Sequence, residues 1–187
     1  MRIIHNAVSD ELIDRCIDEI HKKKTQDVWG ISKWKWGQPL TKGFKQFCFS
    51  SRPEVYQFND LRNQLTQYFA RVPTNINYHL WLPGSGINWH DDNMNIYGAT
   101  LYLNDWEPEK GGVFMWREKD TEELKCMHPQ RNMLMINEYG EDHAVTPIMV
   151  NEGAGLRLSV QIFCQYPNEE LNRGQPSAPV PPEGHYD

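Results

Sequence analysis

Two side chains that commonly bind metal ions stand two positions apart in the segment NWHDDN at 88–93, namely His90 and Asp92. On an extended strand, positions i and i+2 project from the same face, so both side chains can reach one ion while Asp91 points away. Two histidines and one carboxylate are the protein ligands of many non-haem iron(II) sites and leave further coordination positions open. A third ligand is therefore expected from elsewhere, and His143 opens a later apolar segment.

A cation within an apolar strand is the second chemical feature. Arg157 lies in LRLSVQIF at 156–163, where burying an unpaired guanidinium would be costly, so it must reach the surface or pair with an anion. A planar guanidinium makes two parallel hydrogen bonds to a carboxylate, and Ser159 on the same strand face can add a hydroxyl donor. A metal site with an inward arginine predicts a ligand with a chelating end and a carboxylate end, such as 2-oxoglutarate.

Each of these features has an ordinary alternative. His90 and His143 could be structural histidines, Asp92 a solvated turn residue and Arg157 an outward charge on an edge strand. The spacing H-x-D occurs on many protein surfaces, so the other motifs that accompany it along the chain decide the interpretation. No general acid or base beyond the metal ligands is predicted.

The segments that must position these side chains fall into two parts. A Ser/Asp cap signal followed by apolar residues at helical spacing predicts a helix at 8–24, and a second is expected at about 53–71. Short alternating runs separated by turn residues then predict strands at 76–82, 96–104, 112–117, 132–137, 143–150 and 156–166. This order indicates a mainly β fold with flanking α-helices, either a small barrel or a double-sheet roll.

The length of 187 residues suits one domain and is short for two. We expect a single domain at 1–167, with a helical N-terminal part at 8–71 and a β-roll core at about 75–166. The segment 168–187 is too rich in proline for helix or sheet, so a flexible tail is expected. Its prolines also raise the alternative that the tail is a substrate of its own active site.

Charge and composition limit the classes of partner. Nineteen Lys and Arg against 25 Asp and Glu leave a net charge of −6, which disfavours binding of nucleic acid mainly through phosphates. No apolar run approaches the roughly 20 residues of a spanning helix, and no signal peptide is recognised, so a cytoplasmic location is expected. The four cysteines form no C-x-x-C pair and are interpreted as reduced thiols. A monomer or small homo-oligomer is expected.

The segment from about Tyr78 to Tyr166 resembles the iron(II)/2-oxoglutarate dioxygenases of the prolyl-4-hydroxylase type. The motifs that carry this resemblance are, in order, PGSG at 83–86, HDD at 90–92, TLYLNDW at 100–106, GGVF at 111–114, PQRNMLMI at 129–136, HAVTP at 143–147 and RLS at 157–159. The resemblance implies a double-stranded β-helix, which is a jelly-roll or cupin-like core with the metal at its open end. It covers roughly half of the chain.

The same resemblance implies the ligands and cofactors. His90, Asp92 and His143 would bind Fe(II), and Arg157 with Tyr102 would bind the distal carboxylate of 2-oxoglutarate. The cosubstrates would be 2-oxoglutarate and O2, with ascorbate as a further candidate. The activity would be hydroxylation of a C–H bond in a peptidyl-prolyl or free amino-acid substrate, with release of succinate and CO2. The family places its basic residue a few positions nearer the second histidine, and a longer hairpin at 151–155 is expected to absorb the difference.

Aromatic residues outside these motifs are candidates for substrate contact. Trp34 and Trp36 lie in the polar segment 26–50, which either covers the barrel or closes over substrate as a mobile lid. Trp89 and Asn95 flank the iron motif and could also contact substrate. The alternative to an enzyme is a non-catalytic jelly-roll or cupin-like binding module, for which a broken triad or a missing basic residue would be typical.

Overall fold

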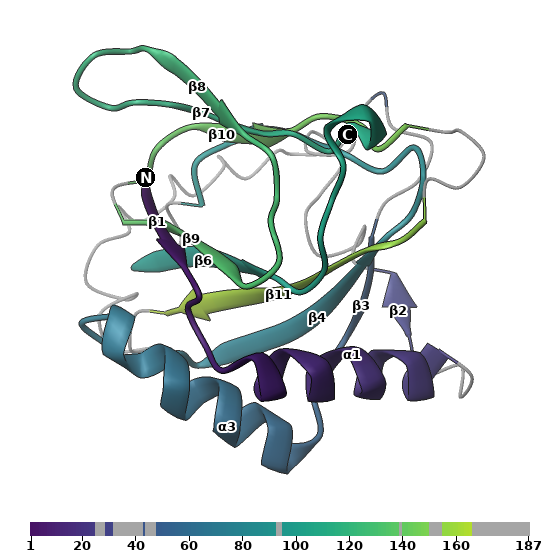
Figure 1. Cartoon of the computed structure of the whole chain (residues 1–187). Helices are drawn as coiled ribbons and strands as arrows, with labels where there is room; N and C mark the ends of the chain where they lie inside the picture. The colour runs from purple at the N-terminus through teal and green to yellow at the C-terminus, as the bar shows by residue number, and fades with distance from the viewer. Residues whose placement is uncertain are drawn as a thin grey trace, which may run out of the picture.

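A computed structural model describes residues 1–24, 29–31, 43, 48–92, 95–138, 140–149 and 155–165. These residues form two antiparallel sheets, and two α-helices cover the outer face of the larger one (Figure 1). The predicted tail, the hairpin at 151–154, Trp34 and Trp36 lie outside the described residues, as does most of the proposed lid.

The larger sheet contains seven strands and carries both helices. In spatial order the strands are β1 (Arg2–His5), β9 (Met133–Asn137), β6 (Tyr97–Tyr102), β11 (Arg157–Cys164), β4 (Asn75–Trp81), β3 (Cys48–Ser51) and β2 (Gly30–Ile31). The central strand β11 pairs antiparallel with β4 on one side and β6 on the other, so Ser159 lies between His79 and Tyr102. This register decides which side chains share a face at the middle of the sheet.

The smaller sheet carries both histidines of the predicted site. Its strands in spatial order are β5 (Ile87–His90), β10 (His143–Val145), β7 (Phe114–Arg117) and β8 (Leu124–Met127). Strand β10 pairs with β5 in antiparallel register, and this places His143 directly opposite His90. Two residues that are far apart in the sequence thus become neighbours through strand pairing.

The two helices follow the predicted pattern, with one difference in length. Helix α1 (Asp10–Lys24) begins after Ser9, whose hydroxyl accepts a hydrogen bond from the Leu12 backbone N–H at 3.3 Å, as expected for a cap. Helix α3 (Val55–Leu65) is shorter than the predicted 53–71. The chain tightens into the 3-10 turn η1 (Thr66–Tyr68), and Phe69 is extended because its ring packs against Tyr97, with ring centroids 5.8 Å apart.

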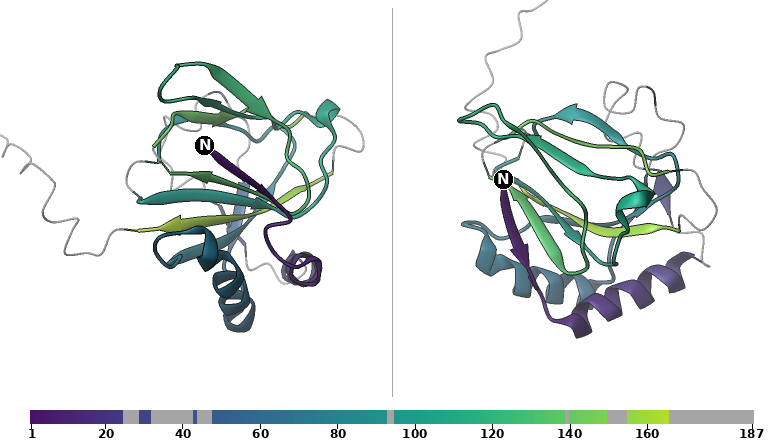
Figure 2. Two further views of the ribbon diagram at one scale, coloured as in Figure 1. Left: turned by 60° about the vertical axis from the view of Figure 1, so that its left-hand side comes forward. Right: turned by 45° about the horizontal axis from the view of Figure 1, so that its top comes forward.

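Strand β11 separates two buried clusters. Leu158, Val160 and Ile162 point toward the helices and pack with residues such as Leu12 and Leu61. The alternate positions face the smaller sheet, where a second cluster includes Trp81, Tyr102, Phe114, Trp116 and Met133. Figure 2 shows both helices on one face of the larger sheet, away from the smaller sheet. The residues that the sequence singles out for chemistry therefore meet in the space between the two sheets.

Several strand boundaries differ from the sequence predictions. Strands β1 and β8 were not predicted, because both are short; the side chains of β8 are largely exposed, and those at the two ends of β1 are exposed as well. The strand predicted at 143–150 ends at Val145, since Pro147 has no N–H to donate, and only an isolated bridge between Ile148 and Gly111 follows. The short 3-10 helix η2 (Pro108–Lys110) precedes that bridge. The predicted mainly β class with flanking helices is confirmed.

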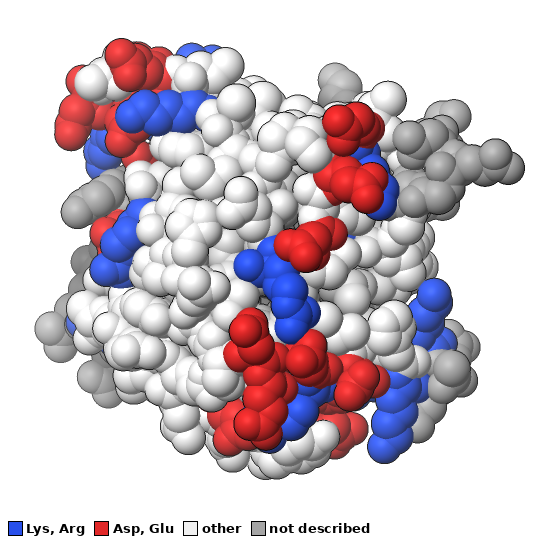
Figure 3. All heavy atoms as spheres, in the orientation of Figure 1, with Lys and Arg blue, Asp and Glu red and all other residues white. Residues whose placement is uncertain are grey.

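The surface is mixed in charge on the face drawn in Figure 3. Acidic and basic side chains lie next to each other over α1 and over the β7–β8 hairpin. Among the described residues, neither α-helix is long and apolar enough to cross a bilayer. The four cysteines are free thiols, as predicted; Cys126 is exposed and the other three are buried.

Candidate functional site

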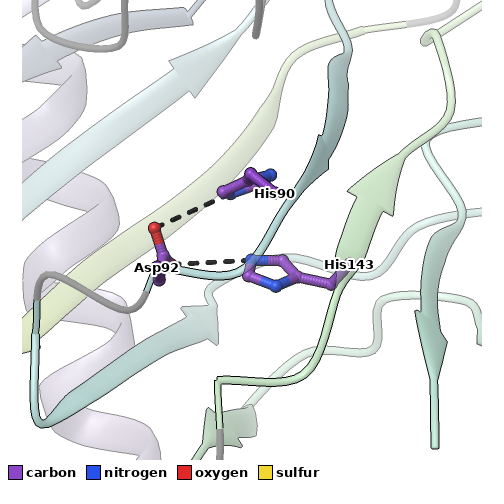
Figure 4. Close-up of side chains that lie close together, drawn as sticks. All are labelled: His90, Asp92 and His143. Atoms are coloured by element: carbon purple, nitrogen blue, oxygen red, sulfur yellow. Dashed lines mark ion pairs between the residues drawn. The ribbon is translucent and has the colours of Figure 1, made fainter.

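Three side chains converge between the paired ends of β5 and β10. The imidazole rings of His90 and His143 lie with their centroids 4.0 Å apart, and the carboxylate of Asp92 faces both (Figure 4). His90 Nε2 is 3.7 Å from Asp92 Oδ1, and His143 Nε2 is 3.5 Å from Asp92 Oδ2. One ligand atom from each residue lies within 4.8 Å of the others, so the three could hold a single cation.

The outer nitrogens of both imidazoles are held by the backbone. His90 Nδ1 lies 2.8 Å from the carbonyl oxygen of Asn88, and His143 Nδ1 lies 2.9 Å from that of Glu141. A carbonyl only accepts, so each Nδ1 carries the proton and each Nε2 presents its lone pair to the space beside Asp92. This is the arrangement that orients a histidine for metal binding.

The electrostatics favour the protonation states that a metal requires. Burial, together with the neighbouring His143, lowers the pKa of His90 below its ordinary value. Burial would raise the pKa of Asp92, but when the imidazoles are protonated, the hydrogen bond from His143 and the charges of both histidines outweigh burial and lower the pKa of Asp92. A neutral imidazole and an ionised carboxylate are the ligating forms of these groups.

Asp92 reaches this position by a turn, which corrects the prediction of an extended strand through residue 92. Strand β5 ends at His90, and Asp92 adopts a positive φ of 56°. Aspartate tolerates this left-handed conformation better than most residues. Gly98 lies so close to the carboxylate that a Cβ added at this position would stand 2.7 Å from Asp92 Oδ2. No local pattern in the sequence singles out Gly98, because its role depends on a contact across a turn.

Arg157 is buried, with 1% of its surface exposed, and faces the space between the sheets. Its Nη1 donates to the Gly112 carbonyl oxygen at 2.6 Å, and its guanidinium carbon lies 4.5 Å from the centre of the Trp81 ring. The Nε of Arg157 has no hydrogen-bond partner among the described residues. The described groups whose charge affects the guanidinium include no carboxylate. Burial lowers the pKa of the guanidinium. A buried cation without a counter-charge is a site for an anion.

Tyr102 and Ser159 lie opposite each other in the pairing of β6 and β11. Tyr102 is buried beside Arg157, with 5.7 Å between its ring centre and the guanidinium carbon, and burial raises the pKa of its phenol. The Ser159 hydroxyl accepts a hydrogen bond from Trp81 Nε1 at 3.2 Å. Tyr102 lines the same cavity as Arg157, and Ser159 packs behind that lining.

One cavity brings the two halves of the site together. It is lined by the three convergent side chains, by Arg157 and by Tyr102. The hydrogen-bonded pair formed by Thr100 and Gln161, at 2.9 Å, lines it as well and was not singled out from the sequence. A small molecule can therefore contact a metal held at one end and the arginine at the other.

The two described candidates for substrate contact lie around this cavity rather than in its lining. Trp89 is 39% exposed, and the guanidinium carbon of Arg117 lies 5.1 Å from its ring centre. Asn95 closes the turn after the carboxylate by donating its backbone N–H to the Asp92 carbonyl oxygen at 3.0 Å. Neither residue is among those that line the cavity.

Comparison with known proteins gives one family match. Residues 75–165, just under half of the chain, match the family model of the 2OG-Fe(II) oxygenase superfamily. This segment holds the three convergent side chains, Arg157 and Tyr102, so the β-roll is similar to that superfamily in the region that carries the candidate site. Comparison with curated protein sequences gives no match.

Solved structures share the fold across most of the chain. A prolyl-4-hydroxylase from Pseudomonas putida matches with a TM-score of 0.66 and 17% identity, covering 88% of this chain and 92% of its own. A prolyl hydroxylase from Trichoplax adhaerens, in complex with a peptide fragment of the hypoxia inducible factor oxygen degradation domain, matches with a TM-score of 0.66 and 14% identity. The match covers 94% of this chain and 87% of that protein's chain. A viral collagen prolyl hydroxylase from Paramecium Bursaria Chlorella virus-1 matches with a TM-score of 0.55 and 14% identity, and the match covers 87% of this chain and 93% of that protein's chain. The predicted double-stranded β-helix is confirmed.

Proposed function

We propose that this protein is an Fe(II)- and 2-oxoglutarate-dependent hydroxylase in which His90, Asp92 and His143 hold the iron. The observation that carries the proposal is a cavity that joins three convergent ligand atoms to a buried arginine, which has no carboxylate partner within the described part of the chain. When bound, iron, 2-oxoglutarate and O2 together supply an oxidant for a C–H bond and yield succinate and CO2.

The chain's own residues orient the cosubstrate and exclude water. Arg157 pairs with the distal carboxylate through its guanidinium, whose Nε has no hydrogen-bond partner among the described residues, and the Tyr102 hydroxyl donates to the same carboxylate. The Phe114 ring stacks on the imidazole of His143, with ring centroids 5.4 Å apart, and so covers one face of this proposed metal ligand. No acid or base beyond the metal ligands is required of the protein.

The proposed substrate is a peptidyl-prolyl residue or a free amino acid. The similarity to a prolyl hydroxylase solved with a peptide fragment and to a viral collagen prolyl hydroxylase supports a peptide or protein substrate. Trp89, exposed next to His90, is a candidate contact for such a peptide. Ascorbate is proposed as a reductant that sustains turnover.

An anaerobic titration of iron-loaded protein with 2-oxoglutarate tests the cosubstrate assignment. Chelation by a 2-oxo acid should give a saturable charge-transfer band in the visible spectrum, which is lost in His143→Ala. Arg157→Ala should keep iron binding and lose the band at the same 2-oxoglutarate concentrations, whereas Arg15→Ala, at an exposed arginine of α1, should behave as wild type. Iron-replete wild type without a band would favour a non-catalytic binding module.

A further inference from the structure

Asn137, the last residue of β9, is buried beside the convergent side chains without pointing a ligand atom at them. Its Nδ2 donates to the Asp91 carbonyl oxygen at 3.2 Å and to the Glu141 carbonyl oxygen at 3.0 Å. Its Oδ1 accepts the Glu141 backbone N–H at 2.9 Å. A carboxamide offers two N–H donors and one carbonyl acceptor, so these three bonds use both donors and the acceptor.

The backbone groups that Asn137 holds belong to both ligand-bearing segments. Asp91 stands between His90 and Asp92, and the Glu141 carbonyl is the atom that orients His143 through Nδ1. Nδ2 also lies 3.3 Å from His143 Nδ1, but both atoms carry hydrogen there, so this contact is not a bond. One side chain thus links two segments that also pair as strands, and it does so from behind the ligand atoms.

The turn at Asp92 has particular need of such support. Its φ of 56° is sparsely populated for residues other than glycine, and such conformations persist where the surroundings hold them. The bond from Asn137 to the preceding carbonyl is one of the contacts that hold it. A looser turn would let the carboxylate move away from the two imidazoles.

We propose that Asn137 is a positioning residue of the metal site, which preorganises His90-x-Asp92 and His143 relative to each other. This inference rests on the proposed function, because it assumes that those three residues bind a metal. Partners of this kind behind the ligands typically contribute about 10- to 100-fold to metal affinity.

The substitution Asn137→Asp tests the proposal with almost no change of shape. It keeps the acceptor for the Glu141 N–H and replaces the amide donor by an oxygen that faces two carbonyl oxygens. Co(II), followed by visible absorption in metal-free protein at fixed pH, is the probe. We expect the dissociation constant for Co(II) to rise about 10- to 100-fold. A second variant, Asn137→Ala, removes all three bonds without adding charge and serves if the first does not fold.

Asn132, immediately before β9, provides a matched control. It is equally buried, accepts the Val8 N–H at 3.1 Å and donates to the Val8 carbonyl oxygen at 2.8 Å, away from the cavity. Asn132→Asp should lower the melting temperature of the metal-free protein and leave the Co(II) dissociation constant unchanged.

Three results would overturn the proposal in distinguishable ways. Asn137 variants that bind Co(II) as tightly as wild type would refute the role of Asn137 and leave the proposed function intact. Equal weakening by Asn132→Asp would show a general effect of lost stability. A wild-type protein that does not bind Co(II) would remove both the proposed function and this inference.

Discussion

Gly112 sits against the buried arginine, and Gly112→Ala should weaken 2-oxoglutarate binding while leaving metal binding intact. Its φ is +64°, a left-handed conformation that costs a residue with a side chain about 1–2 kcal/mol. The added Cβ would stand 2.7 Å from Arg157 Nη1 and 3.2 Å from Ile148 Cγ1. The guanidinium must therefore shift, although it packs between the rings of Trp81 and Tyr102.

The size of the effect follows from the bonds that the shift disturbs. In the native protein, Arg157 Nη1 donates to the Gly112 carbonyl oxygen at 2.6 Å, and this bond fixes the orientation of the guanidinium plane. Displacement should cost one charged hydrogen bond to the cosubstrate carboxylate, worth about 1.5–3 kcal/mol. That corresponds to a rise of roughly 10- to 100-fold in the dissociation constant for 2-oxoglutarate. The free energy of unfolding should fall by the backbone penalty of about 1–2 kcal/mol.

Anaerobic calorimetry of iron-loaded protein with 2-oxoglutarate measures the affinity, and a Co(II) titration measures the metal site. Gly43→Ala is the control, because Gly43 also has a positive φ, of +91°, and no described atom lies within 4 Å of the added Cβ. It should share the backbone penalty and keep the affinity for 2-oxoglutarate. A folded Gly112→Ala protein that binds 2-oxoglutarate as tightly as wild type would refute the placement of the distal carboxylate at Arg157.

Two further predictions concern the carboxylate and the thiols. Gly98→Ala should weaken Co(II) binding at least tenfold in the same titration, because its Cβ would lie 2.7 Å from Asp92 Oδ2; unchanged affinity would contradict this. Burial raises the pKa of Cys16 and of Cys164 to about 11, so at pH 8 a thiol reagent should modify the exposed Cys126 first. Unfolded thiols ionise near 9.0, so the free energy of unfolding should fall as pH rises from 9.0 toward 11, by about 2–3 kcal/mol for Cys16. A Cys16→Ala protein with the same slope in denaturant titrations would exclude that cause.

Local patterns were sufficient for most of the elements, although not for β1 and β8, and for the types of residue in the candidate site. The apolar spacing and Ser9 predicted α1, and the alternation along 156–163 predicted a strand with Arg157 on one face. Such patterns are readable because helical and strand periodicity depend only on neighbours in the chain. The prediction was wrong for the end of α3 and for the backbone at Asp92, where contacts made elsewhere in the fold override local preference.

Residue types and local spacing pointed to the two histidines, the carboxylate between them and an arginine in an apolar strand. It took the folded chain to place His143 opposite His90, to bury Arg157 with no carboxylate partner among the described residues, and to bring small or polar residues around them. Gly112 and Asn137 contact atoms distant in the chain, and Gly98 contacts Asp92 across a turn. Those contacts depend on the register between strands and on the course of turns, which no local spacing encodes.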